Sequence, residues 1–262
     1  MFSCTAQERQ ELIALWQTSF GDERREIEHF FHVFRESGDL LFLKKDEKVV
    51  SALYLLPQEL AIEGELYQAG YLYAAATAPD CRGAGYMGEL IERTFDLCKK
   101  RGYAACVTLP ASDSLYGYYK RFGLEPCVGQ RRRKINCESS LKDSIHPVGW
   151  KRGLTYHHYR SILLKQAKVL IKSRETFESV QRYPDLSFFS AKEAYVILRG
   201  ECVVDAAGER SALEEFMRYG MVNDFTSACP ELGAPERYGS AKAITGLQQR
   251  QLKNLYMTLM ME

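Results

Sequence analysis

The chain has 262 residues, of which 46% are hydrophobic and 26% charged, a composition typical of a globular protein rather than a disordered or fibrous one. Its 35 lysines and arginines nearly balance its 34 aspartates and glutamates, so no overall charge attracts nucleic acid or an anionic membrane. No apolar run is long enough to span a bilayer or form a signal core, and we expect a cytoplasmic protein. The eight cysteines contain no C-x-x-C pair, which argues against a metal site.

The first part of the sequence predicts two helices followed by antiparallel strands. Apolar residues recur at helical spacing within residues 6–34, and Gly21-Asp22 divides this segment into two amphipathic helices. Residues 40–77 consist of apolar runs separated by turn residues, a pattern that indicates strands and hairpins. We expect the turns at Asp46-Glu47 and at Gly64.

The clearest helix of the sequence covers residues 85–101. Its apolar residues lie on one face and its charged residues on the other, and Gly102 supplies a C-terminal stop. A strand over 103–109, a short helix over 114–121 and a strand pair that reaches Asn136 are predicted to follow.

The second half of the chain predicts a separate, smaller lobe. We expect a first domain over residues 1–137, a linker over 138–153 and a C-terminal α+β lobe over 154–262. This lobe is predicted to contain a helix over 159–183, a strand pair and a helix over 211–219. Because its order faintly repeats the first half without the glycine-rich loop, we interpret it as a degenerate second copy that carries no catalysis.

A glycine-rich loop from Arg82 to Gly88 joins a predicted strand to the N-terminus of the clearest helix. Glycine lets the backbone approach a ligand closely, and the unpaired N–H groups of a first helical turn bind phosphate oxygens. This arrangement favours a pyrophosphate ligand, to which Arg82 would add positive charge.

The same loop also matches the dinucleotide fingerprint as Gly83-x-Gly85-x-x-Gly88, so a nicotinamide or flavin oxidoreductase is an alternative. That fold expects an acidic residue at the end of the next strand, whereas the strand over 103–109 has none and the first acid is Asp113. Antiparallel hairpins upstream also fit a parallel, doubly wound sheet poorly.

Two segments resemble the GCN5-related N-acetyltransferase (GNAT) superfamily. The run Arg82-Gly83-Ala84-Gly85, which follows a strand and Ala78-Pro79-Asp80, is similar to the acetyl-CoA pyrophosphate motif of that family. The run from Tyr118 to Leu124 is similar to its closing segment, and the two motifs lie in the family's order and spacing. Met87 stands where glycine or alanine is usual, with Gly88 next, which resembles the enhanced-intracellular-survival branch of aminoglycoside acetyltransferases.

This resemblance covers roughly the first half of the chain and implies both a fold and an activity. The fold would be of the mixed α/β class, the GNAT fold with an α+β type mixed sheet, followed by the second lobe. The activity would be transfer of the acetyl group of acetyl-CoA to a primary amine by direct attack. The acceptor would be a small-molecule or peptide amine, whose identity the sequence leaves open, as it does the oligomeric state. A CoA-binding module without catalysis is a further alternative.

The resemblance also implies roles for single residues. Tyr119 matches the tyrosine that protonates the departing CoA thiolate, although Tyr116 and Tyr118 lie close to it in the sequence. Survival-type relatives bring their C-terminal carboxylate into the site, which makes Glu262 a second catalytic candidate. The predicted cofactor-binding residues are Ala75, Ala76, Thr77, Arg82, Gly83, Ala84, Gly85, Tyr86, Met87, Gly88, Ser112 and Asp113. The last two equally predict a helix N-cap.

Overall fold

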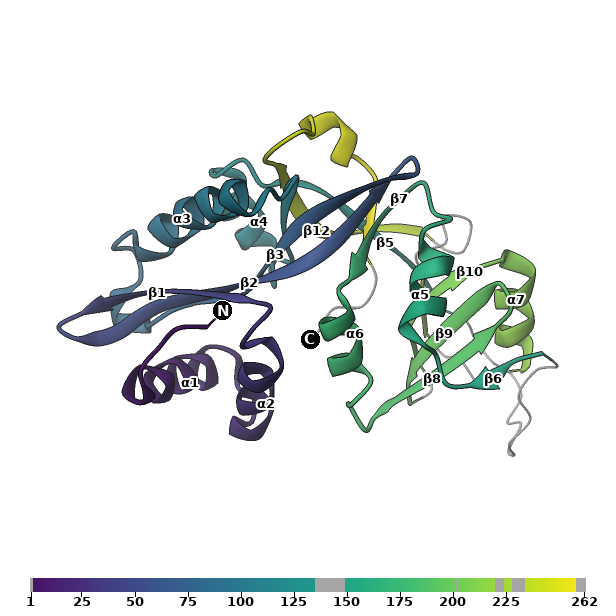
Figure 1. Cartoon of the computed structure of the whole chain (residues 1–262), viewed down its shortest axis with the longest axis horizontal. Helices are drawn as coiled ribbons and strands as arrows, with labels where there is room; N and C mark the ends of the chain where they lie inside the picture. The colour runs from purple at the N-terminus through teal and green to yellow at the C-terminus, as the bar shows by residue number, and fades with distance from the viewer. Residues whose placement is uncertain (1, 135–148, 201, 220–223, 228–233, 258–262) are drawn as a thin grey trace. The chain divides into compact units, whose positions relative to one another are not determined.

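The computed structural model describes residues 2–134, 149–200, 202–219, 224–227 and 234–257 (Figure 1). The chain forms two compact units: unit 1 contains Met1–Gln58, Tyr67–Pro126 and Gly239–Gln251, and unit 2 contains Glu59–Leu66, Cys127–Tyr238 and Leu252–Glu262. The chain therefore returns to unit 1 after residue 238. The predicted boundary at residue 137 and most of the predicted linker lie outside the described residues, so the predicted domain limits stay predictions.

The sheet of unit 1 is mixed, with its strands in the order β1, β2, β3, β4 and β12. These are β1 (Asp39–Lys45), β2 (Lys48–Ile62), β3 (Glu65–Thr77), β4 (Ala105–Thr108) and β12 (Ala234–Ala243). β1 and β2 are antiparallel, β3 and β4 are parallel, and β4 and β12 are antiparallel. The predicted α/β class with a mixed sheet is confirmed.

The helices of unit 1 are α1 (Ala6–Phe20), α2 (Arg24–Phe34), α3 (Tyr86–Arg101) and α4 (Asp113–Lys120), which confirms the helices predicted in this part of the chain. Figure 1 shows α1 and α2 on one side of the sheet and α3 on the other. Trp16 of α1 packs on Tyr54 of β2, with 5.1 Å between the ring centroids. Leu90 of α3 shares a buried core with Leu53 and Leu55. Because successive side chains of a strand point to opposite faces, β2 supplies both cores.

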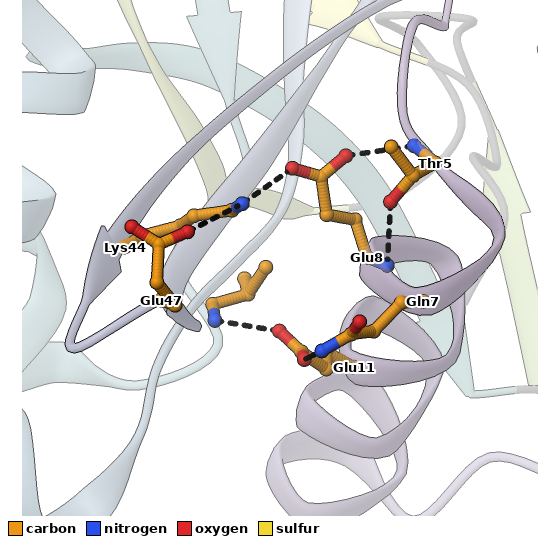
Figure 2. A network of polar contacts seen from close by, with 7 residues as sticks. Thr5, Gln7, Glu8, Glu11, Lys44 and Glu47 are labelled. Carbon is orange, nitrogen blue, oxygen red and sulfur yellow. Dashed lines mark hydrogen bonds and ion pairs between the residues drawn. The ribbon is translucent and has the colours of Figure 1, made fainter.

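Carboxylates of α1 fasten this helix to the β1–β2 hairpin (Figure 2). The ammonium of Lys44 lies 2.7 Å from the carboxylate of Glu8. The backbone N–H of Thr5 donates a hydrogen bond to the same carboxylate in a capping box, and both contacts lower the pKa of Glu8. Glu11 accepts the backbone N–H of Val49 at 2.8 Å, which lowers the pKa of Glu11. These contacts fasten the first two turns of α1 to the β1–β2 hairpin.

The sheet of unit 2 has the order β7, β13, β5, β11, β10, β9, β8 and β6. These strands are β5 (Glu125–Lys134), β6 (Lys151–Arg152), β7 (Lys168–Lys172), β8 (Leu186–Ala191), β9 (Ala194–Arg199), β10 (Cys202–Gly208), β11 (Asp224–Ser227) and β13 (Leu255–Met257). The predicted pair β9–β10 is confirmed as antiparallel. After β10 the chain forms α7 (Arg210–Tyr219), as predicted, and β11, which runs parallel to β10.

The single helix predicted over residues 159–183 is wrong. The segment forms two short helices, α5 (Tyr156–Leu163) and α6 (Arg174–Val180), with the buried strand β7 between them. A short continuous apolar run does not distinguish a buried strand from a helix by periodicity, and this one contains the β-branched residues Val169 and Ile171.

The core of unit 2 contains a buried ion pair. The ammonium of Lys172 lies 3.4 Å from a carboxylate oxygen of Asp205 and 3.4 Å from the hydroxyl of Tyr159. The hydroxyl of Tyr195 donates to the other carboxylate oxygen at 3.0 Å. Burial lowers the pKa of Lys172, and the carboxylate opposes this shift. Desolvation makes such a pair weakly stabilising as a whole but costly to break.

Asp205→Ala is expected to lower the free energy of unfolding of unit 2 by about 3–5 kcal/mol, because the charge of Lys172 loses its buried partner. The double variant Lys172→Met/Asp205→Leu should recover most of that loss, since apolar side chains replace a desolvated pair. Urea unfolding followed by Trp150 fluorescence in a Trp16→Phe background isolates the signal of unit 2, because the chain has two tryptophans and Trp150 lies in the core of this unit. Equal stability of the single variant and its parent would contradict the role of the pair.

Candidate functional site

Unit 1 contains a cavity of about 840 Å³ at one end of its sheet. The walls come from the end of α1, the end of β3, the loop that leads into α3, and α4. The lining residues are Ser19, Phe20, Ala75, Ala76, Thr77, Cys81, Arg82, Gly83, Gly85, Tyr86, Met87, Gly88, Ser112, Ser114, Leu115, Tyr118, Tyr119, Arg121 and Phe122.

A separation of two parallel strands opens this cavity. β3 and β4 pair from Ala69 and Ala105 as far as Leu72 and Thr108, and β3 then continues without this partner. Two residues further on, Ala74 has a left-handed backbone conformation with φ of 46°. This conformation costs a non-glycine residue about 1–2 kcal/mol, so the surrounding structure must impose it.

The end of β3 is held by β2 instead. The hydroxyl of Ser51 donates to the carbonyl oxygen of Ala76 at 3.2 Å and lies 2.9 Å from the hydroxyl of Thr77. The backbone N–H of Ala78 donates to the carbonyl oxygen of Val50 at 2.8 Å. The backbone of residues 75–77 therefore stays on β2 while β4 diverges, and these residues line the resulting gap.

The glycine-rich loop forms a second wall. A 3-10 turn (Pro79–Cys81) precedes Gly83, with φ of 81°, and Gly85, with φ of 89°, which is the N-cap of α3. A Cβ atom at either glycine would meet nothing within 4 Å, so the left-handed backbone and not crowding requires glycine. Gly85 has no side chain to cap the helix, which leaves the N–H groups of the first turn for another acceptor.

Arg82 closes the base of this loop. Its Nε–H donates to the carbonyl oxygen of Thr77 at 3.2 Å, across the residues that form the 3-10 turn. The bond keeps the guanidinium beside the cavity, close to the positive end of the α3 dipole. Arg82 and the N-terminus of α3 together favour an anionic ligand at this wall.

Tyr119 of α4 lies at the apex of the strand separation. Its side chain is buried and forms a hydrogen bond with Thr108, whose hydroxyl donates to the carbonyl oxygen of Leu72 at 3.2 Å. Leu72 and Thr108 are the last paired residues of β3 and β4. Burial raises the pKa of Tyr119 to about 12, so the phenol is protonated at neutral pH.

Phe122 connects α4 to the glycine-rich wall. A Cβ atom added to Gly88 would lie 3.3 Å from the ring of Phe122, so the first turn of α3 packs closely on that ring. The ring centroids of Phe122 and Tyr118 are 5.3 Å apart, and the guanidinium carbon of Arg121 lies 4.7 Å from the Tyr118 centroid. Phe122 therefore contacts two walls of the cavity, the first turn of α3 and α4.

Most of the predicted site residues lie around this one cavity. Tyr119 lines it, as do all the predicted cofactor-binding residues except Ala84 and Asp113. Glu262 lies outside the described residues. A further set of lining residues has no predicted role: Ser19, Phe20, Ser114, Leu115, Arg121 and Phe122. The sequence shows only that Phe20 lies at the end of a predicted helix next to Gly21. In the structure its side chain is 46% exposed.

Comparison with protein families and solved structures agrees with this geometry. Residues 3–127 match the family described as an acetyltransferase (GNAT) domain. The chain has the GNAT fold. The match covers the four walls of the cavity, while most of unit 2 lies outside it. A comparison with curated proteins gives no match.

Solved structures with the GNAT fold resemble nearly the whole chain. A GCN5-related N-acetyltransferase from Anabaena variabilis has a TM-score of 0.71 at 17% identity, covering 92% of this chain and 72% of that one. A protein from Enterococcus faecalis described as a probable N-acyltransferase has a TM-score of 0.71 at 16% identity, covering 92% and 71%. Eis1 from Mycobacterium abscessus has a TM-score of 0.66 at 12% identity, covering 92% and 72%. At these identities the likeness shows the fold alone, and the survival branch stays a prediction.

The buried phenol of Tyr119 can be titrated directly. Subtracting the alkaline absorbance titration of Tyr119→Phe from that of the parent should leave a transition with a midpoint at about 12. Because this pKa is raised above the unfolded value, the phenol contributes stability that is complete below about pH 10 and is lost as the pH rises through 12. A midpoint at or below the ordinary value, at a pH where circular dichroism shows a folded protein, would contradict the burial of this group.

Proposed function

We propose that unit 1 binds acetyl-CoA in its cavity and transfers the acetyl group to a primary amine. The observation that carries this proposal is that one cavity contacts both the uncapped N-terminus of α3 and the buried phenol of Tyr119. The helix N-terminus suits the pyrophosphate of CoA. The phenol at the strand separation suits the sulfur end of the same molecule.

The bond changes of this reaction need no covalent enzyme intermediate. The amine nitrogen bonds to the thioester carbonyl carbon, and backbone N–H groups of residues 75–77 stabilise the oxyanion that forms. Collapse of this intermediate breaks the C–S bond. The departing sulfur takes the proton of Tyr119, and the proton that the ammonium nitrogen loses restores the phenol through water, which leaves an amide and the CoA thiol.

The raised pKa of Tyr119 defines how this proton moves. A phenol with a pKa of about 12 is protonated before every turnover. An ordinary thiol has a pKa of about 8.5, so full transfer to a free thiolate would be unfavourable. Tyr119 therefore acts first as a hydrogen-bond donor to the departing sulfur, and the uphill transfer of its proton is completed as the proton lost by the ammonium nitrogen restores the phenol through water.

The other cavity residues supply binding and orientation. The first-turn N–H groups of Tyr86, Met87 and Gly88 would hold pyrophosphate oxygens, and Arg82 would add charge beside them. The small side chains of Ala75 and Ala76 leave room for the acetyl-bearing arm along the end of β3.

We further propose that unit 2 is a degenerate copy of unit 1. The parallel strands β10 and β11, which α7 connects, support this because β3, α3 and β4 have the same arrangement. The loop before α7 differs from the glycine-rich loop in one respect. A Cβ atom at Gly208 would lie 2.2 Å from the carbonyl oxygen of Glu193, so backbone crowds this junction where Gly83 and Gly85 have open space. This difference supports catalysis in unit 1 alone.

Tyr119→Phe is expected to lower kcat about 10²–10⁴-fold in a thiol-release assay with acetyl-CoA and a panel of amines, because the departing thiolate loses its proton donor. The Kd for acetyl-CoA, measured by isothermal titration, should change little, since the ring and its packing remain. Tyr116→Phe is the matched control: it removes a phenol from the same helix at a buried residue that does not line the cavity.

The rival functions give different results in the same experiment. Binding of acetyl-CoA without turnover of any amine would favour a CoA-binding module. Absence of acetyl-CoA binding together with binding of a nicotinamide or flavin dinucleotide would favour the oxidoreductase. An equal loss of kcat in Tyr119→Phe and Tyr116→Phe would remove the specific role of Tyr119.

A further inference from the structure

The returning strand β12 completes the sheet of unit 1 next to β4. Its residues Ser240–Ala243 pair with Ala105–Thr108 in antiparallel register. Gln249 fastens the end of this strand, because its side-chain oxygen accepts the N–H of Ala243 at 2.9 Å and its nitrogen donates to the carbonyl oxygen of Ala241 at 2.8 Å. The end of β12, which is remote in sequence from the cavity residues, is thus held next to β4.

The ammonium of Lys242 on this strand contacts Phe122, which lines the cavity, and Phe95 of α3. The ammonium donates a hydrogen bond to the carbonyl oxygen of Phe122 at 2.8 Å. The same nitrogen lies 3.8 Å from the ring centroid of Phe95 on α3. Both contacts are electrostatically favourable for an ammonium, because the carbonyl oxygen and the face of the aromatic ring each carry partial negative charge.

Lys242 packs on the turn at Phe122 and Gly123, which follows α4. Gly123 has a left-handed backbone with φ of 82°, and a Cβ atom there would lie 3.4 Å from Cε of Lys242. The turn is also tied to α4, because the N–H of Phe122 donates to the carbonyl oxygen of Tyr119 at 3.0 Å. Carbonyl groups at a helix C-terminus lack intrahelical donors, and a cation there also complements the helix dipole.

The consequence for the cavity follows from the position of Phe122. Its ring lines the cavity, packs on Gly88 in the first turn of α3 and contacts the ring of Tyr118. The hydrogen bond from Lys242 therefore fixes Phe122, which contacts both the first turn of α3 and α4, the helix that carries Tyr119.

We propose that Lys242 is a positioning residue for the acetyl-CoA site, acting through Phe122. This inference rests on the proposed function for its effect on binding, although the contact itself does not. Sequence alone does not distinguish Lys242 from a solvated lysine, because it lies on a strand more than 100 residues after the segment from Tyr118 to Leu124.

The test compares Lys242→Met, which keeps the length of the stem and removes the ammonium, with Lys242→Arg, which keeps a charged donor. Gln249→Ala is the matched control, because it weakens the fastening of β12 without removing a contact to Phe122. For each variant, hydrogen exchange of residues 118–124 is measured without ligand, and the Kd and KM for acetyl-CoA are measured with kcat and the melting temperature.

Lys242→Met should raise the Kd and KM for acetyl-CoA about tenfold, the scale of one hydrogen bond from a charged group, and should speed exchange over residues 118–124. Lys242→Arg should restore most of the affinity and the slow exchange. Gln249→Ala should lower the melting temperature and raise the Kd less than Lys242→Met does, because the pairing of β12 with β4 still holds Lys242. Equal effects of Lys242→Met and Gln249→Ala on the Kd, or unchanged exchange in Lys242→Met, would overturn the proposal.

Failure of the proposed function gives a distinct result. If the parent protein does not bind acetyl-CoA, the proposed function is wrong, but the exchange measurement still decides whether Lys242 orders the turn. Faster exchange in Lys242→Met alone would then support the positioning role, and unchanged exchange would overturn it.

Discussion

The separation of β3 from β4 after Leu72 and Thr108 is the constraint on which the site depends. Two parallel strands would otherwise satisfy each other's backbone groups and leave no room for a ligand. The left-handed Ala74 turns β3 away, and Ser51 holds the next residues on β2. The end of β3 thus continues past its pairing with β4 and lines a cavity, while β2 holds it in place.

The parts around this gap are fixed by contacts from different regions of the sequence. Figure 2 shows the carboxylates in the first two turns of α1 that fasten this helix to the β1–β2 hairpin. The last residues of the same helix, Ser19 and Phe20, line the cavity. On the other side, the ring of Phe122 packs on Gly88 of α3, and its carbonyl oxygen accepts a hydrogen bond from the ammonium of Lys242 on β12. Pre-organisation of this kind is what the proposed direct transfer would require, because that reaction needs two reactants held in one geometry.

The sequence allowed much of this site to be predicted, because its strongest signals are local. The two glycines that need a positive φ, the strong helix after them and Tyr119 all lie within short motifs. Features that depend on strand pairing or on contacts between remote residues are harder to predict from the sequence. The helix predicted over 159–183 is wrong because a short apolar run such as β7 has no distinctive period. Ala74 could not be found from its residue type, since alanine gives no sign of a left-handed backbone. Lys242 could not be found either, because its partner carbonyl is remote in sequence.

A crystal structure of the protein grown with CoA would test most directly whether the cavity of unit 1 binds this ligand. We expect density for the pyrophosphate on the N–H groups of Tyr86, Met87 and Gly88, and the thiol sulfur within hydrogen-bond distance of the Tyr119 hydroxyl. CoA bound elsewhere on the chain, or bound in the cavity with its sulfur remote from Tyr119, would contradict this expectation.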